Sequence, residues 1–138
     1  QAHVLQRLGS RHVMIVYGLE GLDEISLSGP TLVGELKDDT IREYRIAPQD
    51  FGLKTQDLSA IKVDGVEQSK ARVLSALANE AGAARDIVAL NAAAGIYVAG
   101  LAPTLAGGMQ KAMDVIASGA ARKKLDAFVG FTQAARDQ

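Results

Sequence analysis

The fold and the candidate site both depend on residues 12–31, which have the sequence HVMIVYGLEGLDEISLSGPT. The run 12–17 is short, apolar and rich in Val and Ile, and Gly18 closes it, so the pattern predicts a buried strand followed by a turn. Gly18 and Gly21 permit backbone conformations that other residues avoid. Asp23 and Glu24 then place two adjacent carboxylates just beyond the strand end, where ligands collect in open α/β sheets.

Two interpretations of this acidic pair remain open from spacing alone. Mg²⁺ is usually held by one or two carboxylates together with substrate phosphates, so Asp23 and Glu24 could form a magnesium–phosphate site. Alternatively, the pair belongs to a solvated turn or to a helix N-terminus, where negative charge is favourable. Ser26, Ser28 and Thr31 either bond phosphate oxygens or cap turns, and turn capping is the preferred interpretation.

The composition is that of an ordinary globular domain. The chain has 138 residues, is 48% hydrophobic and 22% charged, and has a formal net charge of −1; this length suffices for one domain with a core. The charge argues against a general nucleic-acid surface, which needs a basic excess. The absence of cysteine excludes disulfides and zinc–thiolate sites and fits a cytoplasmic protein. No apolar run approaches the ~20 residues that cross a bilayer, so we expect no membrane partner.

The first half of the chain predicts strands. A helix end at residues 2–8 directly before a strand suggests an α/β unit with a parallel sheet. Residues 31–37 and 40–46 both alternate apolar and polar side chains around Asp38-Asp39, which predicts a β-hairpin with one solvated face. After one helical turn, residues 52–64 are expected to form a loop.

The second half predicts about four helices. The first begins at Val66 and ends at Gly82. The second, residues 84–102, is apolar on every side and is therefore expected to be buried on every side. Its small residues suggest a close helix contact, so Gly95→Leu is expected to overpack the site.

The last two helices are predicted at residues 105–118, after Thr104 as N-cap, and at residues 120–134. The final helix is expected to direct three apolar side chains inward, and residues 136–138 are expected to fray. The three inward side chains are Leu125, Phe128 and Val129.

Several polar residues could have functional roles, but a structural role is the preferred interpretation for each of them. Asn91 lies in an apolar helix and is expected to tie that helix to a loop such as 18–24. Asp86 suits a helix N-terminus, and Arg85 is expected to pair with an acid near residues 64–67. His12 is expected to be a hydrogen-bonded structural residue. With His3 as the only other histidine, a catalytic triad or zinc site has little support.

Two motifs carry a resemblance to a known family. The segment GLDEIS at 21–26, followed by GPT at 29–31, is similar to the magnesium-binding segment of anthranilate phosphoribosyltransferases, and so is RDIVALNAAA at 85–94. The resemblance extends from about Leu5 to about Phe131. One departure is Tyr17, where the family commonly has His.

The resemblance implies an α/β fold, namely the C-terminal part of the nucleoside phosphorylase/phosphoribosyltransferase catalytic domain. We expect residues 1–138 to form a short sheet with a β-hairpin, packed by about four C-terminal helices, without the N-terminal helical domain. That family holds phosphoribosyl diphosphate with Gly-x-Gly-Gly-Asp and Lys-x-Gly-Asn-Arg segments, and neither occurs here. The chain is therefore expected to be a piece of a longer enzyme and to be inactive alone.

The resemblance further implies transfer of a phosphoribosyl group from phosphoribosyl diphosphate to anthranilate, releasing pyrophosphate, in tryptophan biosynthesis. Asp23 and Glu24 would hold magnesium, with Glu24 nearest the diphosphate, and no catalytic or substrate-binding residue is assigned in this chain. The full-length protein is expected to be a cytoplasmic homodimer. Alternatives are a pyrimidine nucleoside phosphorylase-like enzyme and a non-catalytic nucleic-acid-binding relative, the latter opposed by the net charge of −1.

Overall fold

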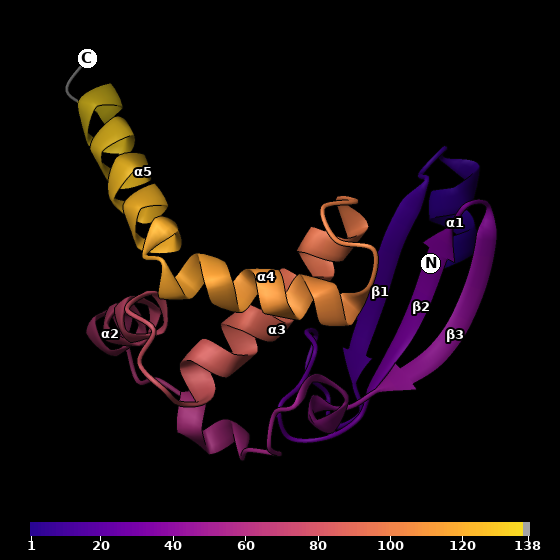
Figure 1. Ribbon diagram of the computed structural model, residues 1–138, viewed down its shortest axis with the longest axis horizontal. Coiled ribbons are helices and arrows are strands. Elements are labelled where there is room, and N and C mark those ends of the chain that lie inside the picture. The colour runs from indigo at the N-terminus through magenta and orange to yellow at the C-terminus, as the bar shows by residue number, and fades with distance from the viewer. Residues whose placement is uncertain (137–138) are drawn as a thin grey trace.

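The computed structural model describes residues 1–136 and contains a small sheet followed by helices. In Figure 1 the sheet lies at one side, α3 and α4 lie side by side in the middle, and α5 projects away at the other side. The helices are α1 (Ala2–Arg7), α2 (Val66–Leu77), α3 (Ala83–Val98), α4 (Leu105–Ala117) and α5 (Ala120–Arg136), with 3₁₀ turns at Pro48–Phe51 and Leu58–Ile61. Of the residues expected to fray, 137 and 138 lie outside the described residues, and Arg136 ends α5.

The predicted hairpin is confirmed, with β2 at Thr31–Lys37 and β3 at Thr40–Ile46 paired antiparallel. Its two turn residues, Asp38 and Asp39, have φ of 48° and 62°. Positive φ at both positions is the mark of a type I′ turn, whose twist matches that of the flanking strands. The alternation of the two strands and the turn chemistry therefore agree.

The expected parallel sheet is wrong. β1 (His12–Gly18) pairs antiparallel with β2, and the three-stranded sheet has the order β1-β2-β3. The loop between β1 and β2 folds straight back, whereas a parallel neighbour requires a crossover connection. Nor is β1 fully buried: residues 12–16 are half-buried and Tyr17 is 50% exposed. As an edge strand among the described residues, it has a neighbouring strand on one side only.

The core joins one face of the sheet to α3 through the loop itself. Ile25 and Leu27, 2% and 1% exposed, pack in one cluster with Val33 and Ile46 of the hairpin and with Leu90 of α3. The second half of the β1–β2 loop therefore contributes side chains to the core. Burying such side chains stabilises by about 1.5–3 kcal/mol each, which fixes the loop firmly in place.

The four expected C-terminal helices are present, with different boundaries. α2 ends at Leu77, and Asn79 just beyond it has a φ of 62°. Asn is the common alternative to Gly at this left-handed helix end. Gly82, expected to end the first helix, instead precedes the first residue of α3. α3 itself stops at Val98 rather than at residue 102.

The expectation that α3 is buried on every side is also wrong. Val88, Ala92 and Gly95 form an exposed stripe, and a Cβ added at Gly95 would meet nothing within 4 Å. Gly95→Leu therefore does not overpack this structure. The close helix contact lies instead at Gly108 of α4, where an added Cβ would collide with the carbonyl oxygen of Ala93 in α3.

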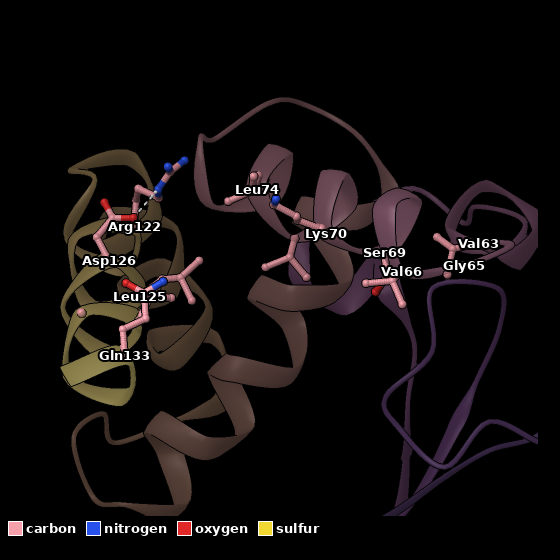
Figure 2. Close-up of a pocket in the computed structure, with 13 residues that line it drawn as sticks. Val63, Gly65, Val66, Ser69, Lys70, Leu74, Arg122, Leu125, Asp126 and Gln133 are labelled. Atoms are coloured by element: carbon pink, nitrogen blue, oxygen red, sulfur yellow. Dashed lines mark hydrogen bonds and ion pairs between the residues drawn. The ribbon is translucent and has the colours of Figure 1, made fainter. Parts of the chain in front are cut away.

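The last helix, α5, has no buried residue. Phe128 and Val129, expected to point inward, are 62% and 41% exposed, while Leu125 is half-buried. α5 faces α2 across an open groove (Figure 2), and the volume of this groove is about 1010 Å³. The final helix therefore contacts the rest of the domain mainly near its beginning.

Candidate functional site

The loop of residues 19–30 is closed at its base by backbone hydrogen bonds. The Gly18 N–H donates to the Leu22 carbonyl at 2.8 Å, and the Gly21 N–H donates to the Gly18 carbonyl at 2.8 Å. Gly21 has a φ of 104°, which only glycine adopts readily. The Leu19 N–H donates to the Pro30 carbonyl at 3.1 Å, so the two ends of the loop meet beside the ends of β1 and β2.

Asn91 fixes the middle of the loop, as the sequence predicted. Its side-chain oxygen accepts a hydrogen bond from the Ile25 N–H at 2.9 Å, and its amide nitrogen donates to the Ile25 carbonyl at 2.9 Å. The same nitrogen donates to the Ile87 carbonyl of α3 at 3.0 Å. One side chain thus satisfies both polar backbone groups of a buried residue and ties it to the helix.

A second tie runs from the loop to α3 through Gln56. The Gln56 N–H donates to the Leu27 carbonyl at 2.9 Å, and its side chain donates to Asp86 Oδ2 at 2.8 Å. Arg85 binds the other oxygen of Asp86 at 2.9 and 3.1 Å. The expected pairing of Arg85 with an acid near residues 64–67 is therefore wrong, because the adjacent, 8% exposed Asp86 requires the charge.

Asp23 and Glu24 precede the fixed residue Ile25 and are both exposed. Within residues 1–136, no hydrogen bond to either carboxylate is formed, so their oxygens are available to a ligand. The described residues contain no group of three or more potential metal-ligating side chains. Two free carboxylates fit a magnesium ion that takes its remaining ligands from a diphosphate and water, which is the usual arrangement for Mg²⁺.

The hydroxyl groups after the acidic pair do form turns. The fully buried Thr31 accepts a hydrogen bond from the Ser26 N–H through Oγ1 at 3.0 Å, and Ser26 Oγ accepts one from the Ser28 N–H at 2.9 Å. The preferred interpretation as turn caps is therefore confirmed for Thr31 and Ser26, whereas the Ser28 hydroxyl donates to Glu20 instead.

The sequence analysis missed Glu20. Its carboxylate oxygen Oε1 accepts hydrogen bonds from the hydroxyls of both Ser26 and Ser28, the latter at 2.8 Å. Glu20 is exposed, and the slight desolvation of its carboxylate would raise its pKa, but the hydrogen bonds from Ser26 and Ser28 bring that pKa below its ordinary value. No pattern in the sequence pairs Glu20 with these serines, because the contact depends on the path of the loop.

His12 is a structural residue, as predicted. Its Nε2 lies 2.9 Å from Glu35 Oε1, and the Tyr44 hydroxyl donates to Glu35 Oε2 at 2.9 Å. Burial raises the pKa of Glu35, but hydrogen bonds from Tyr97, His12 and Tyr44 lower it by a larger amount. The pKa of Glu35 therefore lies below its ordinary value. This network lies at the end of β1 opposite Gly18, away from the acidic pair.

The open groove between α2 and α5 is not part of this site. Its walls are mainly aliphatic, with Val66 and Leu74 on one side and Leu125 and Val129 on the other, and none of its lining residues belongs to the loop of residues 19–30. Within the described part of the chain, no helix has the length and apolar character needed to cross a bilayer.

The hairpin, the helices packed on it and the loop carrying two free carboxylates form an α/β domain. Residues 1–122 match the model of the glycosyl transferase family, a/b domain, and the chain belongs to this family.

Individual relatives point to one activity within the family. The chain is 59% identical over 133 residues to an anthranilate phosphoribosyltransferase from Polynucleobacter asymbioticus, a match that covers 96% of this chain and 39% of that protein. The crystal structure of anthranilate phosphoribosyltransferase from Thermus thermophilus superposes with a TM-score of 0.86 at 38% identity, covering 96% of this chain and 39% of that one.

A third relative was solved with ligands. The anthranilate phosphoribosyltransferase from Saccharomyces cerevisiae, in complex with phosphoribosyl diphosphate (PRPP) and Mg, superposes with a TM-score of 0.76 at 26% identity, covering 89% of this chain and 36% of that chain. The resemblance found in the sequence is thereby confirmed. The chain spans about 39% of the length of the curated relatives that it matches.

Proposed function

We propose that this chain acts in an enzyme that transfers a phosphoribosyl group from phosphoribosyl diphosphate to anthranilate, releasing pyrophosphate, in tryptophan biosynthesis. The observation that carries the proposal is the pair of free carboxylates, Asp23 and Glu24, presented beside the tied residue Ile25. The similarity to anthranilate phosphoribosyltransferases, one of them solved with PRPP and Mg, supports it.

Asp23 and Glu24 are the residues that would hold magnesium. When bound, the ion would offset negative charge on the departing diphosphate. The chain's own contribution is positional: Asn91 holds Ile25 in the core, so the two preceding carboxylates point to solvent from a fixed backbone. Orientation of this kind lowers a barrier without any proton transfer, and no general base is assigned in this chain.

The remaining features of the enzyme belong to the same proposal. We place it in the cytoplasm as a homodimer, without nucleic acid or membrane as partner. Its residues for binding the ribose, the diphosphate and anthranilate would come largely from segments outside this sequence, since the chain matches only 39% of its relatives' length.

The test is Glu24→Gln in the complete enzyme, with initial rates measured over a range of Mg²⁺ concentrations. Loss of one carboxylate ligand should reduce magnesium-dependent turnover strongly, while the free energy of unfolding stays within about 0.5 kcal/mol because the side chain is exposed. Glu43→Gln, an exposed glutamate on β3, is the matched control.

Unchanged turnover of Glu24→Gln at all magnesium concentrations would remove the metal role. Turnover of a pyrimidine nucleoside with inorganic phosphate, in place of anthranilate with phosphoribosyl diphosphate, would overturn the assigned reaction.

A further inference from the structure

We propose that Glu20 is a positioning residue that joins the two halves of the loop and sets the arrangement of Asp23 and Glu24 before a divalent cation binds. The inference rests on the proposed function only in taking those two carboxylates as the metal ligands. The joining of the loop stands on contacts of its own.

The first half of the loop folds back on itself around Glu20. Gly18 is buried, and a Cβ added there would approach Glu20 Oε2 at 3.2 Å and Leu22 Cβ at 3.1 Å. The Glu20 carboxylate therefore lies over the Gly18 backbone, although the residue as a whole remains exposed. The absence of a side chain at position 18 leaves room for this fold.

The second half of the loop supplies two hydroxyl donors to the same carboxylate oxygen. Ser26 and Ser28 both donate to Glu20 Oε1. Ser26 is fully buried, and the Ser28 N–H donates to Ser26 Oγ at 2.9 Å. The buried Ser26 therefore holds Ser28 in place. Hydrogen bonds to an ionised carboxylate are about twice as strong as those between neutral groups, which makes Glu20 a firm link between the halves.

Asp23 and Glu24 lie between this link and the Asn91 tie. On one side the 18–22 turn is held by its own hydrogen bonds and by Glu20, and on the other Ile25 is held by Asn91. The acidic pair is thus confined to the short segment between two fixed points. Because the acidic pair is already confined, less conformational entropy is lost when a cation binds. The affinity for the cation therefore rises although Glu20 does not contact the ion.

A rival role for Glu20 is a direct electrostatic one, as a third ligand or a nearby negative charge. Three variants separate the two roles. Glu20→Ala removes the charge and the acceptor, Glu20→Gln removes the charge but keeps an acceptor oxygen, and Ser28→Ala removes one donor and leaves the charge intact. Positioning requires the hydrogen bonds, whereas an electrostatic role requires the charge.

The experiment measures Mn²⁺ alone binding to the complete protein by electron paramagnetic resonance of the free ion. Deuterium uptake of residues 19–24 is measured in parallel without metal. We expect about tenfold weaker binding for Glu20→Ala, and about threefold for both Ser28→Ala, which loses one hydrogen bond, and Glu20→Gln, which weakens two. Uptake should rise in the same order. Glu43→Gln and Ser69→Ala, both exposed and outside the loop, are the matched controls.

Equal weakening by Glu20→Ala and Glu20→Gln, with Ser28→Ala unchanged in both measurements, would overturn the positioning role in favour of charge. Asp23→Asn separates this outcome from a failure of the proposed function. If Asp23→Asn leaves Mn²⁺ binding unchanged, the metal role of the pair is wrong, while deuterium uptake in Ser28→Ala and Glu20→Ala still decides whether Glu20 joins the loop.

Discussion

The contact between α3 and α4 at Gly108 yields a prediction with an unusual sign. Gly→Ala within a helix ordinarily stabilises it by about 1 kcal/mol, because alanine has the higher helix propensity. Gly108 lies inside α4, but an added Cβ would collide with the Ala93 carbonyl oxygen and lie 3.1 Å and 3.3 Å from its carbonyl carbon and Cα. We therefore expect Gly108→Ala to destabilise the protein.

The magnitude follows from the atoms involved. Overpacking a core costs about 1–3 kcal/mol, and the upper part of that range applies here because a helix backbone, unlike a flexible side chain, cannot rotate aside. Ala93 is fully buried at this contact, and Leu90 packs α3 into the core cluster with Ile25, so moving α3 away from α4 would disturb that packing. Subtracting the propensity gain leaves a net loss of about 1–2 kcal/mol in the free energy of unfolding.

The assay is urea unfolding at equilibrium, with Gly95→Ala as the matched control. Gly95 lies inside α3 on its exposed stripe, where an added Cβ meets nothing within 4 Å, so that variant should be more stable than the parent by up to about 1 kcal/mol. The two alanine variants should therefore lie on opposite sides of the parent. A Gly108→Ala protein as stable as Gly95→Ala would refute the close approach of the two helices.

Three further predictions concern side chains that form hydrogen bonds. Asn91→Leu leaves both backbone groups of the 2% exposed Ile25 without their partner, so we expect a loss of about 2–3 kcal/mol in urea unfolding; a loss below about 1 kcal/mol would contradict the tie. Thr104→Ala removes the N-cap acceptor of the Gly107 N–H at 3.0 Å and should cost about 1 kcal/mol, whereas Thr104→Ser should retain most of the stability. Because the pKa of Glu35 is lowered in the folded state, its ionised form adds stability at neutral pH, and this contribution disappears as the pH falls through the folded-state pKa. In Glu35→Gln, the free energy of unfolding in urea should therefore fall less steeply as the pH is lowered. An unchanged slope would argue against the network of Glu35 with His12 and Tyr44.

The parts of the fold that the sequence predicts well are governed by neighbouring residues. The hairpin follows from alternation over residues 31–37 and 40–46 and from a turn pair that tolerates positive φ, all within a short segment. The pairing of β1 is different, because an apolar run is compatible with a parallel or an antiparallel neighbour. Only the path of the connecting loop decides between them, and that path depends on distant contacts such as Asn91 with Ile25.

The predictions of helix boundaries and of burial are wrong for a related reason. Asn79 and Gly82 can each end a helix, and the sequence does not show which one adopts the left-handed conformation. The small residues of α3 predict a close contact with another helix. Which face of α3 makes this contact depends on the position of Gly108 in α4.

At the candidate site, the sequence identified the exposed acidic pair and the role of Asn91. It did not identify Glu20, because a carboxylate and two serine hydroxyls on one loop can point in many directions. Nor did it pair Arg85 with its neighbour Asp86, since adjacent residues on a helix ordinarily point apart. The role of Asp23 and Glu24 as metal ligands stays a prediction.

The lack of buried side chains on α5 has a consequence for how unfolding should be interpreted. An isolated helix of this length is only marginally stable in water, and α5 gains little from tertiary packing. It should therefore open as a cooperative unit of its own, at a free energy well below that of the sheet and α3. A two-state analysis of the helical circular-dichroism signal would combine these two transitions, whereas a probe in the core cluster around Ile25 and Leu90 would report the global one alone.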